Sequence, residues 1–478
     1  MTLGEIATAI NAQSLNLDIN QKVTGNVVID SRNIKAGDLF VAINGEKVDG
    51  HTFCEIAIKQ GAVAVITSKE IAGVPCLLVS DGIKESKDVD QPSVIALGKL
   101  AKYLLSKLPN IWKIAVTGSS GKTTTKDLLT DLGNLIGPTV APSGSFNNEI
   151  GLPQTVLKCD ENTKVLILEM GARKIGNIKR LCEIAKPDTS IILNIGTAHA
   201  EIFESIENIL KAKSEIIECL DSTDTAILNH EDPTFLKQKT KAKIISFGLA
   251  GAEVSAKNVV LNNNAQASFD LEFKGKSCSV ALKLVGAHQV ANSLAAAAAF
   301  LDHGVEIDKV AQVLSSSTPK SRWRMQVELS ANNVTVINDS YNANPESVKS
   351  AIKTLKQIGE GKNTFAILGE MRELGSLSKS AHEEIAALII KLEIKNTLVI
   401  GNGAKFISDF LASHQYQGKI SFVENIEKGL LKAKELISSN DVVLVKASRS
   451  IGLERVANAI LEDFSENIGN TKNQGVGP

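Results

Sequence analysis

Short runs of apolar residues alternate along the chain with segments whose apolar residues recur every three or four positions. The first pattern is typical of strands buried inside a sheet, and the second is typical of helices that cover a sheet. Because the alternation continues through most of the chain, it predicts α/β architecture with largely parallel sheets. The predicted strands are Leu39–Ile43, Ala62–Ile66, Cys76–Val79, Trp112–Thr117, Val165–Leu168, Ile191–Ile195, Ala226–Leu228, Val334–Asn338, Thr364–Leu368, Thr397–Ile400, Ile420–Val423 and Val442–Val445.

Breaks in this pattern indicate where the chain divides. Residues 252–284 alternate polar and apolar positions around turn-forming residues, which predicts antiparallel strands, and an alanine-rich helix is predicted over Ala287–Leu301. Pro109 ends a predicted helix, Ser93–Leu108, and a polar stretch with Pro319 precedes the last group of strands. The length also favours about three domains. The expected divisions are residues 1–110, 111–317 and 318–465, followed by a disordered tail at 466–478.

Composition and charge exclude several classes of protein. The 478 residues carry a net charge of -1, with 43% hydrophobic and 22% charged residues, as in ordinary globular proteins. Without an excess of one charge, no general attraction to nucleic acid is expected. The sequence has neither a long apolar run nor a signal-peptide pattern, so we expect a cytoplasmic protein without membrane insertion. The scattered cysteines indicate neither a zinc site nor a disulfide framework.

A glycine-rich segment between a predicted strand and a predicted helix carries the strongest chemical signal. It reads T-G-S-S-G-K-T-T over residues 117–124. Glycines let backbone N–H groups approach phosphate oxygens, the lysine adds a positive charge, and a hydroxyl group can bind Mg²⁺. The general phosphate-loop pattern has glycine where Val116 stands, so a plain glycine turn is the alternative. The strand–turn–helix setting favours the phosphate loop.

Glu169 and His199 each follow a predicted buried strand. In nucleotide-binding sheets, a strand beside the phosphate loop brings a carboxylate to Mg²⁺, which makes Glu169 a candidate ligand. The alternative for Glu169 is a solvated strand end. His199 leaves its strand at the end where ligands collect in parallel sheets, although a lone histidine is more commonly structural.

Lys213 lies on the apolar stripe of a predicted helix. It either reaches water from the edge of the stripe or is buried for a function. Burial would lower its pKa, and a neutral amine can take up CO₂ to form a carbamate. A carbamate is an anion and could bind Mg²⁺ as a carboxylate does. The other members of the stripe are Ile206, Ile209, Leu210, Ile216, Ile217 and Leu220.

Together these segments resemble the Mur ligase family over residues 1 to roughly 465. The T-G-S-S-G-K-T-T loop is that family's variant of the phosphate loop, and it accounts for Val116. The resemblance implies a domain for the UDP end of the substrate, a central P-loop ATPase domain and a Rossmann-like C-terminal domain. Further matching motifs are S-F-N-N-E-I-G-L-P at 145–153, E-M-G-A-R at 169–173, D-S-Y-N-A-N-P at 339–345 and L-G-E-M-R-E-L-G at 368–375.

By this resemblance we expect a monomeric ligase that uses ATP and Mg²⁺ in peptidoglycan synthesis. It would add D-alanyl-D-alanine to UDP-N-acetylmuramoyl-tripeptide through an acyl phosphate. The alternatives are a ligase of the same fold that adds a single amino acid, a folylpolyglutamate-type synthase, and a P-loop regulatory ATPase. Glu370 and Glu373 leave a basic amino acid open as the acceptor.

The resemblance also implies roles for individual residues. Without it, Asp339 and Asn344 could be turn residues and Arg324 a solvated surface cation. The implied catalytic residues are Lys122, Lys213 and His199. The implied metal ligands are Thr123, Glu169, His199 and carbamoylated Lys213. Gly118, Ser119, Ser120, Gly121, Lys122, Thr123, Thr124, Asn292 (adenine), Arg324 and Asp339 (ribose) would bind the nucleotide, and Ser31, Arg32, Asn44, His51, Asn147, Asn148, Tyr341 and Asn344 would bind the other substrates.

Overall fold

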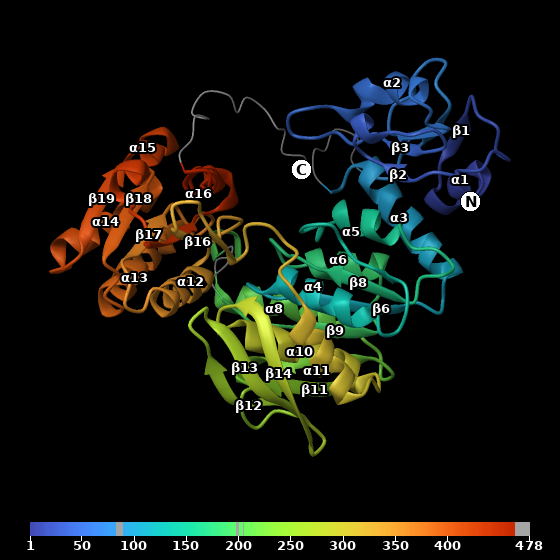
Figure 1. The fold of residues 1–478 in the computed structure, drawn as a ribbon. Coiled ribbons are helices and arrows are strands. Elements are labelled where there is room, and N and C mark those ends of the chain that lie inside the picture. The colour runs from blue at the N-terminus through green and yellow to red at the C-terminus, as the bar shows by residue number, and fades with distance from the viewer. Residues whose placement is uncertain (83–88, 197–199, 204, 464–478) are drawn as a thin grey trace.

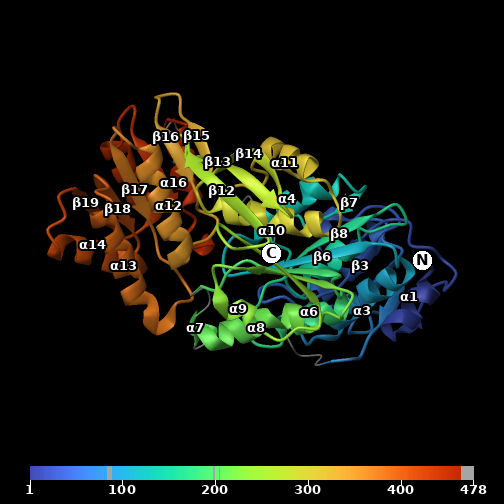
Figure 2. The same cartoon turned by 90° about the horizontal axis from the view of Figure 1, so that it is seen from below.

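The computed structural model describes residues 1–82, 89–196, 200–203 and 205–463, which form three units, each built on its own sheet (Figure 1). The N-terminal, central and C-terminal units have sheets of five, nine and six strands, and helices accompany each sheet, so the predicted α/β class is confirmed. The N-terminal and C-terminal units lie at opposite ends of the molecule (Figures 1 and 2). None of the described helices offers the apolar length that a bilayer crossing needs. The divisions expected at 110 and 317 fall between consecutive sheets and stay predictions, while the expected tail at 466–478 lies outside the described residues.

The N-terminal unit has strands in the order β1-β5-β4-β3-β2. Alternate residues of β3 face opposite sides: Leu39 and Val41 pack with helices α1 and α3, and Phe40 packs against α2. The sequence pattern does not predict β1 and β2, because these short strands are not buried and lack the continuous apolar run that marks β3. The elements are α1 (Leu3–Ile10), β1 (Gln13–Leu15), β2 (Val27–Val28), β3 (Leu39–Val41), α2 (Cys54–Lys59), β4 (Ala64–Thr67), β5 (Cys76–Leu78) and α3 (Pro92–Lys107).

The central sheet has the order β14-β13-β12-β11-β10-β9-β6-β8-β7. Strands β6 to β11 pair in parallel and have helices on both faces, which is why they read as continuous apolar runs. In Figure 2, α10 and α11 lie on one side of this sheet, and α6 and α8 lie on the other. The antiparallel strands predicted within residues 252–284 are confirmed as β12, β13 and β14. The elements are β6 (Trp112–Thr117), α4 (Lys122–Gly133), β7 (Thr139–Val140), α5 (Gly151–Val156), β8 (Val165–Glu169), α6 (Asn177–Ile184), β9 (Thr189–Ile192), α7 (Ala200–Phe203), α8 (Ile206–Glu218), β10 (Thr225–Asn229), α9 (Pro233–Leu236), β11 (Lys243–Gly248), β12 (Val254–Leu261), β13 (Gln266–Phe273), β14 (Lys276–Val285), α10 (Gln289–Asp302) and α11 (Ile307–Ser316).

The C-terminal sheet has the order β15-β16-β20-β17-β18-β19, and only β15 pairs antiparallel among these strands. The parallel strands place their carboxyl ends at one edge, where loops of an α/β sheet bind ligands. The loops that follow β16, β17 and β20 therefore share this edge. The elements are β15 (Gln326–Leu329), β16 (Thr335–Asn338), α12 (Pro345–Ile358), β17 (Thr364–Leu368), α13 (Ser378–Lys391), β18 (Asn396–Ile400), α14 (Lys405–Ser413), β19 (Lys419–Val423), α15 (Ile426–Leu436), β20 (Val442–Lys446) and α16 (Glu454–Leu461).

The alanine-rich helix α10 is buried along most of its length, between α4 and the central sheet. Its small side chains let the neighbouring elements approach closely. Phe300 is the large exception: it is fully buried, and its ring meets Trp112 edge-on, with 5.1 Å between the ring centroids. This one side chain therefore fills space that the alanines leave at the end of the helix.

Phe300→Ala should destabilise the central unit by about 3–5 kcal/mol, because it opens a cavity in a core that cannot fully collapse. The measurement is denaturant unfolding followed by circular dichroism. Leu431→Ala is the control, since Leu431 is 61% exposed on a helix, and surface substitutions usually change stability by less than about 0.5 kcal/mol. Equal losses in the two variants would contradict this account of the core.

Candidate functional site

A cavity of about 670 Å³ lies between the central and C-terminal units. Its lining is mainly polar, and cationic side chains outnumber acidic ones. The cations are Lys122, Arg173, Lys174, Lys213, Arg324 and Lys446, and the acids are Glu149, Glu169 and Asp339. Such an excess of positive charge suits a ligand that carries several negative charges. Among the described residues of the N-terminal unit, Val89 alone lines this cavity.

The predicted phosphate loop joins β6 to α4 at the wall of the cavity. Gly121 has a φ of +82°, and a Cβ atom there would lie 2.4 Å from the Asn292 side-chain oxygen, so this position needs glycine. Lys122 is half-buried, and its Nζ donates to the Gly118 carbonyl oxygen at 2.6 Å. Burial lowers the pKa of Lys122, and Glu169 opposes this effect. The loop thus holds its lysine inside the cavity, and Asn292 lies against the loop.

Glu169 ends β8 beside this loop. The register of β6 and β8 pairs Val116 with Glu169, which brings the carboxylate next to the start of the loop. Glu169 is only 1% exposed, so it is not a solvated strand end. One carboxylate oxygen accepts from the Thr123 hydroxyl at 3.0 Å, and the other accepts from Asn147 Nδ2 at 2.8 Å. A hydroxyl and a carboxylate in contact form the kind of oxygen donor set that Mg²⁺ prefers.

Lys213 lies on α8 and is 4% exposed, and it lines the cavity rather than reaching outside water. Burial lowers its pKa well below the ordinary value, and the nearby positive charge of Lys122 lowers it further. One detail of the predicted stripe is wrong, because Ile206 is 56% exposed. Glu215 of the same helix is buried, and its carboxylate accepts from the backbone N–H groups of Gly176 and Lys179 at the start of α6.

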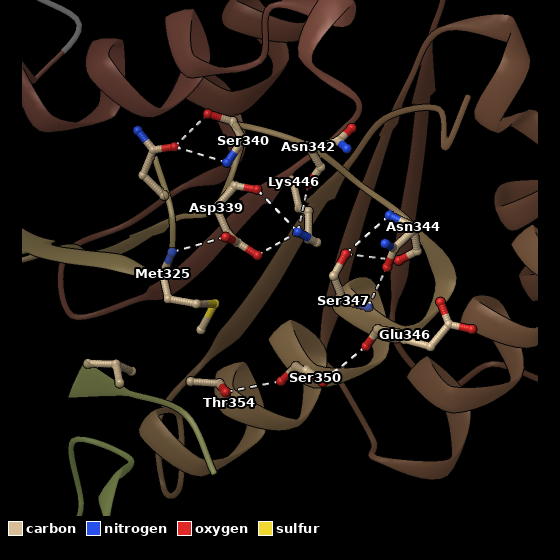
Figure 3. Close-up of polar contacts among 12 residues, drawn as sticks. Met325, Asp339, Ser340, Asn342, Asn344, Glu346, Ser347, Ser350, Thr354 and Lys446 are labelled. Carbon is tan, nitrogen blue, oxygen red and sulfur yellow. Dashed lines mark hydrogen bonds and ion pairs between the residues drawn. The ribbon is translucent and has the colours of Figure 1, made fainter. Parts of the chain in front are cut away.

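Asp339 follows β16 and is held from two sides (Figure 3). Its Oδ2 accepts from Lys446 Nζ at 2.5 Å, and its Oδ1 accepts from the Met325 backbone N–H at 3.0 Å. Lys446 also donates to the Asn342 carbonyl oxygen at 2.8 Å. This buried ion pair ties the end of β20 to the loop after β16, so Asp339 is more than a turn residue.

Asn344 begins α12 and contacts the phosphate loop. Its Oδ1 accepts from the Ser347 backbone N–H at 2.9 Å, which caps the helix (Figure 3). Its Nδ2 donates to the Ser119 carbonyl oxygen at 3.3 Å. The same amide therefore caps the first turn of a helix of the C-terminal unit and joins that unit to the central one.

Arg324 also spans the two units. Its guanidinium lies over the Tyr341 ring, 3.9 Å from the ring centroid, and its Nη2 donates to the Ser145 hydroxyl at 3.0 Å. Arg324 and Tyr341 both line the cavity, so Arg324 is not a solvated surface cation. Asn147 and Asn148 line the same space, and Asn148 Oδ1 accepts from the Gly151 backbone N–H at 2.8 Å.

Other predicted site residues do not join this cavity. Ser31, Arg32, Asn44 and His51 belong to the N-terminal unit and are absent from its lining. Arg32 pairs with Asp30 at 2.6 Å. His51 is buried, with its Nδ1 2.5 Å from an Asp49 carboxylate oxygen and its Nε2 2.9 Å from the Ser68 hydroxyl. His199 lies outside the described residues, so its predicted role stays a prediction.

Sequence reasoning missed three residues of the cavity. Asn194 Oδ1 accepts from the backbone N–H groups of Ser119 and Ser120, at 3.1 and 3.0 Å, and so braces the phosphate loop. Lys446 holds Asp339, and His288 is half-buried in the same cavity, where loss of hydration lowers its pKa. Asn194 lies near the end of a predicted strand and Lys446 follows another, which is the available signal, but polar residues at strand ends are commonly solvated.

Comparisons with known proteins find the same similarity along the whole chain. Residues 24–95 match the Mur ligase family catalytic domain, 116–300 the Mur ligase middle domain, and 323–449 the Mur ligase glutamate ligase domain. The chain is 34% identical to the UDP-N-acetylmuramoyl-tripeptide–D-alanyl-D-alanine ligase of Mycobacterium tuberculosis (strain ATCC 25618 / H37Rv), over 97% of this chain and 98% of that one. It is 32% identical to the Bacillus subtilis (strain 168) protein of the same name, over 96% and 98%.

Solved structures give the same result. MurF from Acinetobacter baumannii superposes with a TM-score of 0.87 at 28% identity, covering 96% of this chain and 98% of that one. The MurF ligase from Thermotoga maritima in complex with ADP superposes with a TM-score of 0.79 at 30% identity, covering 93% and 99%. The similarity therefore extends through all three units and their arrangement.

The lowered pKa of Lys213 predicts a pH-dependent cost to folding. Between the folded-state pKa and the ordinary value of 10.5, the unfolded chain binds a proton that the folded chain does not, so stability falls as pH falls through this range. Lys213→Met removes this cost. In CO₂-free buffer the variant should gain stability over the parent at pH 7, and the gain should shrink as pH approaches 10.5.

The measurement is urea unfolding at a series of pH values. Lys211→Met is the matched control, because Lys211 is exposed on the same helix. The same pH dependence of stability in both variants would show that burial of Lys213 does not lower folding stability as the pH falls.

Proposed function

The chain belongs to the Mur ligase family, and we propose that it adds D-alanyl-D-alanine to UDP-N-acetylmuramoyl-tripeptide, converting ATP to ADP and phosphate. The observation that carries this proposal is the meeting of two loops at one cavity. The phosphate loop of the central unit and the 339–344 loop of the C-terminal unit both line it, and Asn344 contacts Ser119. Phosphoryl transfer at the phosphate loop and binding of the acceptor amine at the 339–344 loop can therefore occur in the same cavity.

ATP would bind along the central side of the cavity. Gly118 to Thr124 would hold its phosphates through backbone N–H groups, with Lys122 supplying positive charge. Asn292 would contact the adenine and Asp339 the ribose. Arg324 would reach the phosphates from the other side, next to Ser145.

Mg²⁺ would lie beside these phosphates. The oxygens of Thr123 and Glu169 fit it, and we propose Lys213, as a carbamate, and His199 as further ligands. Burial lowers the pKa of Lys213 and so favours its neutral amine, which is the form that combines with CO₂. When bound, the ion would spread the negative charge that builds up on the transferred phosphoryl group.

The reaction follows from the chemistry of a carboxylate, which is a poor electrophile until it is phosphorylated. An oxygen of the terminal tripeptide carboxylate would attack the γ-phosphorus of ATP, releasing ADP and forming an acyl phosphate. The amine of D-alanyl-D-alanine would then attack the acyl carbon. The bond from that carbon to the bridging oxygen breaks, phosphate leaves with the electron pair, and the amine loses a proton. Lys122 and Arg324 would hold the phosphate oxygens in line throughout.

The lining of the C-terminal side supports a dipeptide acceptor. Tyr341, Asn342, Asn344, Ser347 and Ser350 offer neutral donors and acceptors, which suit a short backbone-like molecule. An acidic pocket for a basic amino acid would need carboxylates there. Glu370 and Glu373 are absent from the lining and pair with arginines instead.

The UDP end of the substrate would lie against the N-terminal unit, near Ser31, Arg32, Asn44 and His51. Val89 brings that unit to the edge of the cavity, which supports one substrate spanning the distance between them. We propose that the enzyme works in the cytoplasm, where ATP is available. We also propose that it acts as a monomer, because the phosphate loop and the 339–344 loop that meet at the cavity belong to the same chain.

The test is phosphate release from ATP with UDP-N-acetylmuramoyl-tripeptide and each candidate amine in turn. D-Alanyl-D-alanine should support turnover, whereas L-lysine and meso-diaminopimelate, offered with the shorter UDP-N-acetylmuramoyl-dipeptide, should not. Folded Lys122→Ala protein is the control for contaminating phosphatases and should lose at least about 100-fold in rate, since it lacks the charge that faces the phosphates. Turnover with a free amino acid and none with D-alanyl-D-alanine would refute the proposal.

A further inference from the structure

Two bulky residues in the linker to the C-terminal unit have left-handed backbone conformations. Trp323 has a φ of +60° and Met325 a φ of +50°, and they flank Arg324. Residues with side chains rarely adopt this region, and when they do, their surroundings must hold them there. The strain lies immediately on both sides of the arginine that reaches the cavity.

Hydrogen bonds to the C-terminal unit hold both residues. The Met325 backbone N–H donates to Asp339 Oδ1 at 3.0 Å (Figure 3), and the Trp323 carbonyl oxygen accepts from the Tyr341 backbone N–H at 3.0 Å. The Trp323 backbone N–H donates to Gln326 Oε1 at 3.1 Å. Since these partners all belong to the C-terminal unit, the linker at 323–325 is fixed to that unit.

The indole ring of Trp323 makes a further contact. The Arg449 guanidinium lies over it, 4.3 Å from the ring centroid, and Arg449 is itself paired with Glu454 at 2.8 Å. Trp323 precedes the first strand of the C-terminal sheet, and Arg449 follows the last one, β20. Glycine would adopt the same φ without strain, so the backbone alone does not call for tryptophan. The role of Trp323 therefore lies in its ring, because indole is the best aromatic partner for a cation.

We propose that Trp323 is a positioning residue whose ring, clamped by Arg449, fixes the strained linker so that Arg324 projects rigidly from the C-terminal unit toward the nucleotide. Arg324 extends from this anchor over Tyr341 to Ser145 of the central unit. When the C-terminal unit contacts the central unit, the Arg324 guanidinium therefore reaches the nucleotide site in one fixed position. This inference rests on the proposed function, in which Arg324 contacts the nucleotide phosphates.

The variants separate the ring from the backbone. Trp323→Gly keeps the left-handed conformation and removes the ring, Trp323→Phe keeps an aromatic face, and Arg449→Met removes the cation from the partly exposed partner. Lys107→Met is the matched control, because Lys107 lies 5.0 Å from the centroid of the Tyr103 ring, away from the cavity. Each protein is assayed for kcat, for the KM values of ATP and of the dipeptide, for the dissociation constant of a fluorescent ADP analogue and for its thermal midpoint.

Trp323→Gly and Arg449→Met should lower kcat/KM for ATP on the order of 10- to 100-fold, with the KM of the dipeptide little changed. Trp323→Phe should recover much of the loss, and Lys107→Met should match the parent. The decisive comparison introduces Trp323→Gly into the Arg324→Ala variant. Removing the ring should have little further effect there, because Arg324 is already absent. Additive effects of Trp323→Gly and Arg324→Ala, or a changed thermal midpoint with unchanged kinetics and ADP affinity, would overturn the proposal.

The ADP titration separates this proposal from the proposed function, because it needs no acceptor. Parent protein without ligase turnover would refute the proposed function alone. In that case, weaker ADP binding in both Trp323→Gly and Arg324→Ala, without additivity, would still support the positioning role. Unchanged ADP binding in Trp323→Gly would overturn it, whatever reaction the parent catalyses.

Discussion

The burial of several basic side chains around one cavity is the constraint on which the rest of the structure depends. Lys213 and Lys446 are buried there and Lys122 is half-buried, and an unpaired buried charge is costly. Lys446 is neutralised by Asp339, whereas burial lowers the pKa of Lys122 and Lys213. A bound polyphosphate would offset the cost of burying these positive charges, so the cavity suits a strongly anionic ligand.

The arrangement of the two sheets follows from that constraint. Each sheet presents the carboxyl ends of its parallel strands, and the loops there carry the polar side chains while the strands stay apolar. Asn344 and Arg324 cross from the C-terminal unit to the phosphate loop and to Ser145. The phosphate loop lies at the edge of one sheet and the 339–344 loop at the edge of the other, so the cavity is divided between the two units.

Periodicity in the sequence predicted the sheets well, because strands such as β6 and β8 are buried on both faces and read as unbroken apolar runs. It also predicted Glu169 and Lys213, since a charged residue in an apolar context is unusual. Periodicity could not predict features that depend on contacts between residues far apart in the sequence. Asp339 and Lys446 meet across 107 residues, and the strain at Trp323 is set by Tyr341 and Arg449. Ile206 fits the helical period yet is exposed at the first turn of α8, where no residue that the structure describes covers it.

The central claim is that a substrate carboxylate attacks ATP in this cavity, and an isotope measurement tests it most directly. The tripeptide substrate is prepared with ¹⁸O in its terminal carboxylate, and the phosphate released during ligation to D-alanyl-D-alanine is examined by mass spectrometry. Activation through an acyl phosphate predicts that each released phosphate carries one oxygen from the carboxylate. Phosphate that takes its oxygen from water instead, with no label from the substrate, would contradict the account and indicate an ATPase.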